Sequence, residues 1–151
     1  DELKVPFIIN QNRYSIFDRT IENNGLKDMA AKLKKGIISF GPLAQGLLTN
    51  RYLNGIPSDS RMVTDGRFLK EDNLTTKKME AISKLNDIAK ERDQSLAQMA
   101  LAWVLRDGIV TSVLIGASES SQVLDNIAAI NKVCFSDEEL KKIDEIVKDY
   151  E

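Results

Sequence analysis

The stretch "GIISFGPLAQGLLTNRY", residues 36–52, holds an apolar run that stops at Gly41, Pro42 and Gly46. Gly and Pro end regular structure, and Gly also lets another group come close to the backbone. The stretch therefore predicts a buried strand over 36–41, followed by a loop whose backbone lies against some other group. The segments on either side indicate what that group is.

Two further apolar stretches are similar to the first. "VPFIIN" (5–10) and "VTSVLIGA" (110–117) contain β-branched residues and are bounded by Gly, Pro or Asn. Near-continuous apolarity, rather than alternation, is typical of a strand covered on both faces, as in a parallel sheet. The sequence thus predicts three parallel strands, each covered on both faces.

Apolar residues at helical spacing predict helices over 20–35, 75–93, 95–108, 118–132 and 136–150. The segment 50–74 is irregular, and loops of that length are uncommon unless they are functional or mobile. The order of the elements predicts an α/β fold with parallel strands and crossover helices. Because three parallel strands are too few for a self-sufficient sheet, either they continue a larger sheet or the chain self-associates.

Capping residues mark several of these helix boundaries. Asn23-Asn24-Gly25 weakens the first turns of the first helix, so its secure part is expected to begin near Leu26. Ser95 is expected to cap the third helix, and Ser136 with Glu139 forms a capping box at the start of the last. The residues expected to face the core are Leu26, Met29, Ala30 and Leu33 in the first helix, Met79, Ile82, Leu85, Ile88 and Ala89 in the second, and Leu96, Met99, Ala100, Trp103 and Val104 in the third.

The composition excludes several classes of function. A formal net charge of −2 gives no basic excess for nucleic acid or for an anionic membrane. The chain has no histidine and one cysteine, Cys134, so it contains no Ser-His-Asp or Cys-His constellation, no His metal site and no internal disulfide. No apolar run is long enough to span a bilayer. We expect a cytoplasmic protein with no nucleic-acid, membrane or metal partner.

Three polar or glycine-containing clusters are expected at the C-terminal ends of the strands, where parallel α/β folds bind ligands: "NQNRY" (10–14), "FGPLAQG" (40–46) and "GASESSQVLDN" (116–126). In the third, Gly116 and Ser118 precede a predicted helix, which favours an anion such as a phosphate. Gln122 and Asn126 lie one helical turn apart, on the same face. A Ser-capped surface helix and an ordinary turn at Pro42 explain the same residues equally well, so spacing alone leaves both readings open.

Taken together, the motifs resemble one family, the NADP-dependent aldo-keto reductases. "PFIINQNRY", "PLAQGLLTNRYLNGIPSDSR", "QSLAQMALAWVLRD" and "TSVLIGASESSQVLDNIAAI" carry the resemblance in the right order and over nearly the full chain. The chain is similar to the branch that includes bacterial L-glyceraldehyde 3-phosphate reductases and potassium-channel β subunits. The family fold is a TIM (β/α)8 barrel, and the resemblance implies that this chain is its C-terminal half, with strands six to eight and their helices.

The resemblance also implies which residues hold NADP(H). Gln11 corresponds to the glutamine that contacts the nicotinamide amide, and Phe40 to the aromatic residue on which the ring stacks. Gln122 stands where many relatives have an Arg that contacts the 2′-phosphate, which leaves the choice between NADP and NAD open. The remaining implied positions are Gly41, Pro42, Leu43, Ala44, Gln45 and Gly46 along the pyrophosphate, Arg51 and Arg61 in the loop that folds over the cofactor, Gly116 and Ser118 at the adenosine phosphate, and Asp125 and Asn126 at the adenine.

The proton-transfer residues of the family are absent from these motifs. The family uses Asp, Tyr, Lys and His from the N-terminal half of its barrel, and none of Tyr14, Tyr52 and Tyr150 falls at the catalytic position. We therefore expect no catalytic residue here, and a segment that is inactive alone although its parent reduces small-molecule aldehydes or ketones. Two alternatives remain: a non-catalytic nucleotide-binding or protein-interaction module, and a folded fragment that binds nothing. An incomplete barrel is expected either to form a homo-oligomer or to need the N-terminal half-barrel.

Overall fold

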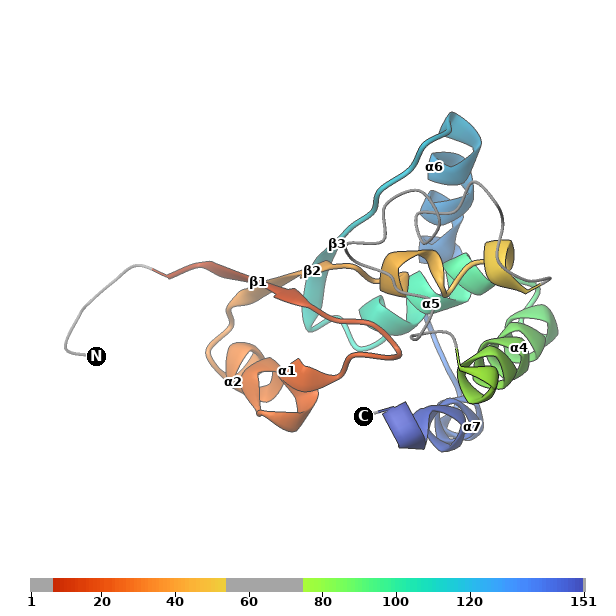
Figure 1. The fold of residues 1–151 in the computed structure, drawn as a ribbon. Helices are drawn as coiled ribbons and strands as arrows, with labels where there is room; N and C mark the ends of the chain where they lie inside the picture. Colours follow the sequence, from red (N-terminus) through yellow and green to blue (C-terminus); the bar gives the residue numbers. More distant parts are fainter. Residues whose placement is uncertain (1–6, 54–74, 151) are drawn as a thin grey trace.

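The structure is a computed structural model that describes residues 7–53 and 75–150. Its sheet contains strands β1 (Ile9–Arg13), β2 (Gly36–Phe40) and β3 (Val110–Leu114), all parallel, with β2 in the centre (Figure 1). The expected α/β fold with a parallel sheet is confirmed. Most of the irregular segment predicted over 50–74, including Arg61, lies outside the described residues.

Strand β1 begins later than the sequence predicts. The expected strand covered 5–10, whereas the observed one contains the polar residues Asn10, Gln11 and Asn12 and extends to Arg13. Parallel pairing with β2 explains the difference, because each of these residues has a backbone partner in β2, from Ile9 with Gly36 to Arg13 with Phe40. The "NQNRY" cluster is therefore mostly part of the strand and does not follow it.

The sheet is not covered on both faces in the part of the chain that the structure describes. Along β2, Ile37 and Ser39 are fully buried, whereas Phe40 is 41% exposed. Ile9 and Leu114, which share the face of Phe40 in the parallel register, are 43% and 46% exposed. The prediction of strands buried on both sides is wrong for these residues. The reason is that the described helices pack against one face only, so burial alternates along the strand.

The first crossover is two short helices, α1 (Thr20–Asn23) and α2 (Leu26–Lys32), and not one helix over 20–35. Gly25 separates them with a φ of 75°, a left-handed conformation that glycine adopts without strain. The expected start at Leu26 is confirmed. Ala30 is buried as expected, whereas Met29 and Leu33, also expected inside, are more than half exposed, and the shortened helix buries Lys27.

The second crossover provides most of the core. Helix α4 (Thr76–Glu91) is followed by α5 (Leu96–Leu105), in which Leu96, Met99, Ala100, Trp103 and Val104 are all completely buried, as predicted. Ser95 caps α5 as expected: its side-chain Oγ accepts a hydrogen bond from the Gln98 backbone N–H at 3.1 Å, and the Gln98 side chain completes a capping box. Burial of so many apolar side chains is the main stabilising contribution to this layer.

Two helices follow β3. Helix α6 (Ser120–Ile127) continues into a 3₁₀ turn, Ala128–Lys132, so only part of the helix predicted over 118–132 is α-helical. Helix α7 (Asp137–Val147) begins with the predicted Ser136–Glu139 capping box and packs beside α4 (Figure 1). No helix of the described residues is long and apolar enough to cross a membrane.

A buried polar cluster joins the first crossover to the end of α5. The Tyr14 hydroxyl lies at its centre: it donates to Glu22 and accepts from Lys27 Nζ at 3.0 Å and from Arg106 Nη1 at 2.9 Å. Burial raises the pKa of Tyr14 to about 12. Burial also acts to raise the pKa of Glu22, but hydrogen bonds from Tyr14, Lys27 and Arg106 outweigh it and lower that pKa to about 2. Both groups thus stay in their ordinary neutral-pH states.

Candidate functional site

The described residues form a cleft of about 950 Å³ beyond the C-terminal end of the sheet. Its walls come from the segment after β2, the segment after β3 with helix α6, and the N-terminus of α5. The lining residues are Gly41, Pro42, Leu43, Gln45, Gly46, Thr49, Asn50, Arg51, Tyr52, Ser95, Ala97, Leu114, Ile115, Gly116, Ala117, Ser118, Glu119, Gln122, Asp125 and Asn126. Two of the three clusters predicted from the sequence therefore meet in one cleft.

The segment after β2 turns sharply at the cleft. Gly41 and Gly46 have φ values of 63° and 96°, and between them Ala44 and Gln45 also have positive φ, at 47° and 60°. Two consecutive non-glycine residues with positive φ are unusual and are found where the surroundings enforce them. Here Leu47 and Leu48 are buried below the turn, and Thr49 Oγ1 donates to the Gly46 carbonyl at 2.7 Å. The turn therefore presents a fixed stretch of backbone to the cleft.

The opposite wall contains the start of α6. The Ser118 backbone N–H donates to Gln122 Oε1 at 3.0 Å, and the Ser118 hydroxyl also lies within hydrogen-bond distance of the Gln122 amide. Gly116 has no heavy atom within 4 Å of the place a Cβ would take, so open space lies beside it. A free backbone N–H at this end of a helix is a donor for an anion. In this structure the Gln122 amide oxygen accepts that hydrogen bond.

Asp125 and Asn126 occupy different surroundings. The Asp125 carboxylate accepts from Ser95 Oγ at 2.9 Å and from Gln98 Nε2 at 2.6 Å, so it connects α6 to α5. Asn126 is 7% exposed and lines the cleft beside it. The aspartate is thus engaged by protein donors, while Asn126 is a buried polar residue in the cleft wall.

Gln11 and Phe40 lie on the open face of the sheet, next to the cleft and not among its lining residues. In the register of β1 and β2, Gln11 pairs with Ile38 and Arg13 pairs with Phe40, so Gln11 and Phe40 are on the same face. Phe40 directly precedes Gly41. Ala44 is half-buried within the turn and does not line the cleft. Arg51 is exposed and lines the cleft from the 3₁₀ turn Asn50–Tyr52.

Sequence reasoning missed some residues of the cleft. Asn50 and Tyr52 lie in the irregular segment predicted over 50–74, and Thr49 directly precedes it, so all three could have been included from position alone. Ser95 and Ala97 could not, because only the packing of α5 beside α6 brings them there. The described residues contain no group of three or more Cys, Asp or Glu side chains that could hold a metal ion.

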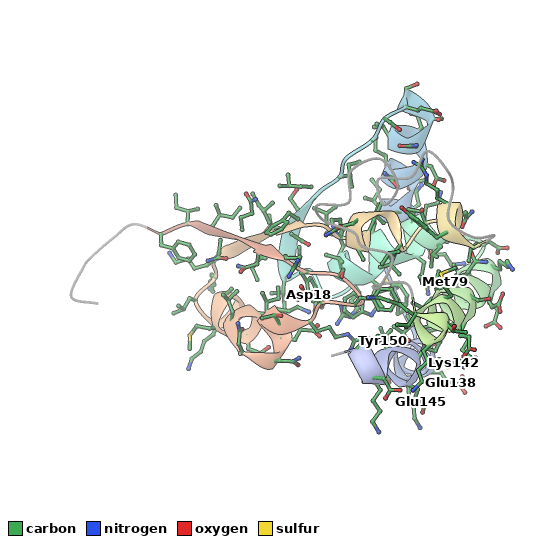
Figure 2. The ribbon with its side chains drawn as sticks, viewed as in Figure 1. Asp18, Met79, Glu138, Lys142, Glu145 and Tyr150 are labelled. Atoms are coloured by element: carbon green, nitrogen blue, oxygen red, sulfur yellow. The ribbon has the colours of Figure 1, made fainter. Side chains whose placement is uncertain are left out.

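A second, smaller groove of about 390 Å³ lies between α4 and α7. It is lined by Lys84, Asp87, Ile88, Glu91, Lys142, Glu145 and Ile146, and the side chains of Lys142 and Glu145 appear on this side of the molecule in Figure 2. Lys142 Nζ lies 3.9 Å from Glu91, a loose surface ion pair. Among the described residues that line this groove, none was predicted for the site.

Comparison with known proteins identifies the protein family of the chain. The sequence profile of the Aldo/keto reductase family matches residues 1–148, and the chain belongs to that family. It is 46% identical over 153 residues to the L-glyceraldehyde 3-phosphate reductase of Escherichia coli (strain K12), with 99% of this chain and 44% of that protein covered. It is 31% identical over 144 residues to a probable voltage-gated potassium channel subunit beta of Oryza sativa subsp. japonica, covering 93% of this chain and 44% of that protein.

Solved structures agree with the sequence comparison. A glycerol dehydrogenase from Gluconobacter oxydans matches with a TM-score of 0.78 at 27% identity, covering 99% of this chain and 45% of that one. An aldo-keto reductase from Bacillus halodurans matches in fold with a TM-score of 0.69 at 23% identity. The chain thus spans less than half the length of the relatives it matches. The resemblance stated from the motifs is confirmed.

Proposed function

We propose that this chain is the NADP(H)-binding C-terminal portion of an aldo-keto reductase that reduces an aldehyde or ketone to an alcohol by hydride transfer. Strands β1, β2 and β3 correspond in this proposal to barrel strands six, seven and eight. The observation that carries it is the single cleft between residues 41–52 and 116–126. The family resemblance assigns these two segments to different parts of one extended dinucleotide, and a shared cleft is what such a ligand requires.

The residues of the cleft fit a dinucleotide. Gly41 and Gly46 adopt left-handed φ values that glycine takes without strain, which lets the turn bring its backbone to the cleft, and Gly116 leaves open space on the facing wall. The Ser118 N–H donates a hydrogen bond to Gln122 Oε1, so this N–H can bind an oxygen acceptor at the cleft. A phosphate oxygen can take the place of that amide oxygen as the acceptor, and because it carries more negative charge it is the stronger acceptor.

Each group of residues has a distinct task in this proposal. The 41–46 turn lies along the pyrophosphate and Arg51 neutralises part of its charge, with Arg61 assigned the same role from the resemblance. Ser118 and Gln122 hold the adenosine phosphate, and Asn126 binds the adenine. Gln11 and Phe40, on the open sheet face, orient the nicotinamide. NADPH, when bound, supplies the hydride, and the donor of the proton is outside this chain.

The identity to the Escherichia coli reductase makes L-glyceraldehyde 3-phosphate the first carbonyl compound to assay with the complete protein. The present chain contains no histidine. Its Tyr14 is fully buried, with a pKa raised by burial, and so cannot reach a substrate from this cleft. We therefore expect no NADPH oxidation by the 151-residue chain with this aldehyde, measured by nicotinamide absorbance.

Binding can be measured separately from catalysis. We expect saturable NADPH binding in calorimetry, weakened about tenfold by Asn126→Ala, the size expected for the loss of one good hydrogen bond at a buried group. Asn131→Ala is the matched control, because Asn131 is an exposed asparagine on the 3₁₀ turn after α6 and does not line the cleft. Equal affinities for the two variants would contradict the role given to Asn126, and no binding at millimolar NADPH would contradict a cofactor site in this chain.

A second candidate function is a nucleotide-binding subunit that catalyses nothing. The 31% identity to a probable potassium channel subunit beta supports it. Both candidates predict binding of NADPH. They differ in the complete protein, where turnover of an aldehyde supports the reductase and binding without turnover supports the subunit.

The proposal also covers assembly. Ile9, Phe40 and Leu114 expose apolar surface on the open sheet face, and this is the face that lies inside a closed barrel. We propose that this face is covered in the functional protein, either by the N-terminal half-barrel or by a second copy of the chain. A purified chain that is a monomer in sedimentation and unfolds cooperatively in calorimetry would contradict that expectation.

A further inference from the structure

Helix α6 is not anchored in the usual way. A helix of a globular protein is normally held by burying an apolar face. In α6 the only buried residue is the polar Asn126, and the apolar side chains of Val123, Leu124 and Ile127 are 37%, 71% and 52% exposed. The position of α6, and of the cleft wall it forms, must therefore depend on other contacts.

One such contact joins Asp125 to the capping box of α5. Gln98 uses both ends of its side-chain amide: Oε1 accepts from the Ser95 backbone N–H at 3.1 Å, and Nε2 donates to Asp125 Oδ1 at 2.6 Å. Nε2 also lies 3.2 Å from the Asp125 carbonyl oxygen, and Ser95 Oγ donates to Asp125 Oδ2 at 2.9 Å. Both carboxylate oxygens are thus engaged by the two residues that cap α5. Hydrogen bonds to a charged acceptor are stronger than those between neutral groups.

We propose that Ser95 and Gln98 are positioning residues, which hold α6 against α5 through Asp125 and thereby fix Asn126 at the cleft. A capping box needs only the acceptor oxygen of Gln98, so the bonds from Nε2 to Asp125 are additional to it. Gln98 is not among the residues that line the cleft, and so its effect on a ligand must act through Asp125. The consequence for NADPH rests on the proposed function, whereas the consequence for α6 does not.

The test replaces Gln98 in a way that keeps the cap. Gln98→Glu preserves an acceptor for the Ser95 N–H, since Glu is itself a capping-box residue, but it removes the donor and places a carboxylate against Asp125. Adding Asp125→Asn restores a donor–acceptor pair with the polarity reversed. Asn24→Asp is the matched control: it adds the same single negative charge at an exposed site and keeps the acceptor for the Leu26 N–H.

Two measurements on the full chain decide the matter. Without nucleotide, we expect hydrogen exchange of the α6 amides to rise about tenfold in Gln98→Glu, to stay unchanged in Asn24→Asp, and to return most of the way in the double variant. The dissociation constant for NADPH should rise in Gln98→Glu and stay unchanged in Asn24→Asp, while the double variant is compared by hydrogen exchange alone, because Asp125 itself lines the cleft. Unchanged α6 exchange in Gln98→Glu, or no recovery in the double variant, would overturn the proposal.

The two proposals fail in different ways. If the unmodified chain does not bind NADPH, the cofactor site is wrong, and the exchange measurement still decides whether Ser95 and Gln98 position α6. If the unmodified chain binds NADPH and Gln98→Glu binds it equally well, the positioning role is wrong and the cofactor site stands.

Discussion

Glu22 is the residue whose charge matters most to the buried polar cluster. Its carboxylate accepts from Tyr14, from Lys27 Nζ at 3.0 Å and from Arg106 Nη2 at 2.8 Å, and its side chain is 23% exposed. Two cations and a hydroxyl around one partly buried carboxylate stabilise its ionised form. Removing that charge would leave Lys27 and Arg106 with fewer partners, which is costly for buried groups.

The pH dependence follows from the pKa of Glu22, lowered from 4.5 to about 2. Because the folded-state pKa lies below the unfolded one, the stabilisation is complete above the unfolded value and is lost as pH falls from 4.5 toward 2. At most about 3 kcal/mol of unfolding free energy is involved. We expect Glu22→Gln to destabilise the chain near neutral pH, and the gap to the unmodified chain to shrink below about pH 4.

Urea unfolding at several pH values measures both effects. Glu138→Gln is the control, since Glu138 is exposed on α7 (Figure 2). A gap between the unmodified chain and Glu22→Gln that is independent of pH would show that the carboxylate is not specifically stabilised in the folded state.

At the scale of single residues, the sequence identified the parts of the site that are local in the chain. Gly41 to Gly46 and Gly116 to Asn126 were each predicted as a cluster, and the structure places both at one cleft. The engagement of Asp125 by Ser95 and Gln98 was not predictable, because it depends on how α5 and α6 pack. The roles assigned to individual residues at NADP(H) remain predictions.

At the scale of elements, Arg92 links α4 to the segment before α7. It is 3% exposed, donates to the carbonyls of Lys132 and Cys134 at 3.0 Å each, and pairs with Glu139 at 2.7 Å. Its guanidinium also lies 3.7 Å from the centre of the Phe135 ring. One planar, multivalent group satisfies these partners together, which an ammonium group cannot do.

We therefore expect Arg92→Lys to lower the unfolding free energy by roughly 2–4 kcal/mol, as for the loss of one member of a buried, hydrogen-bonded charged group. The surface substitution Lys142→Arg is the matched control and should change the unfolding free energy by less than about 0.5 kcal/mol. Denaturant unfolding gives both values. If Arg92→Lys is as mild as the control, Arg92 does not act as the link described here.

The starts of helices α5 and α7 were predicted better than the bounds of strand β1, for physical reasons. Ser95 and Ser136 mark helix starts through local hydrogen bonds that the sequence specifies directly. Strand β1 contains Asn10, Gln11 and Asn12, which resemble a turn in the sequence, and its place is set by pairing with β2. Tertiary context therefore decided the strand, as is common for β structure.

At the scale of the whole molecule, the chain is a layer of helices on one face of a parallel sheet, with the other face open in the described residues (Figure 1). Apolar runs in the sequence led to an expectation of strands covered on both faces. Such runs indicate that both faces of a strand are apolar, but they do not indicate which segment of the protein covers each face. The chain covers less than half the length of its relatives, which agrees with a larger parent fold.

The central claim is that one nucleotide spans the walls of the cleft. Hydrogen exchange of the 151-residue chain with and without saturating NADPH tests it most directly. We predict that amides in residues 41–46 and in residues 116–126 become protected together, while those of α7 stay unchanged. Protection of only one of these segments, or of neither, would contradict a dinucleotide bound across the cleft.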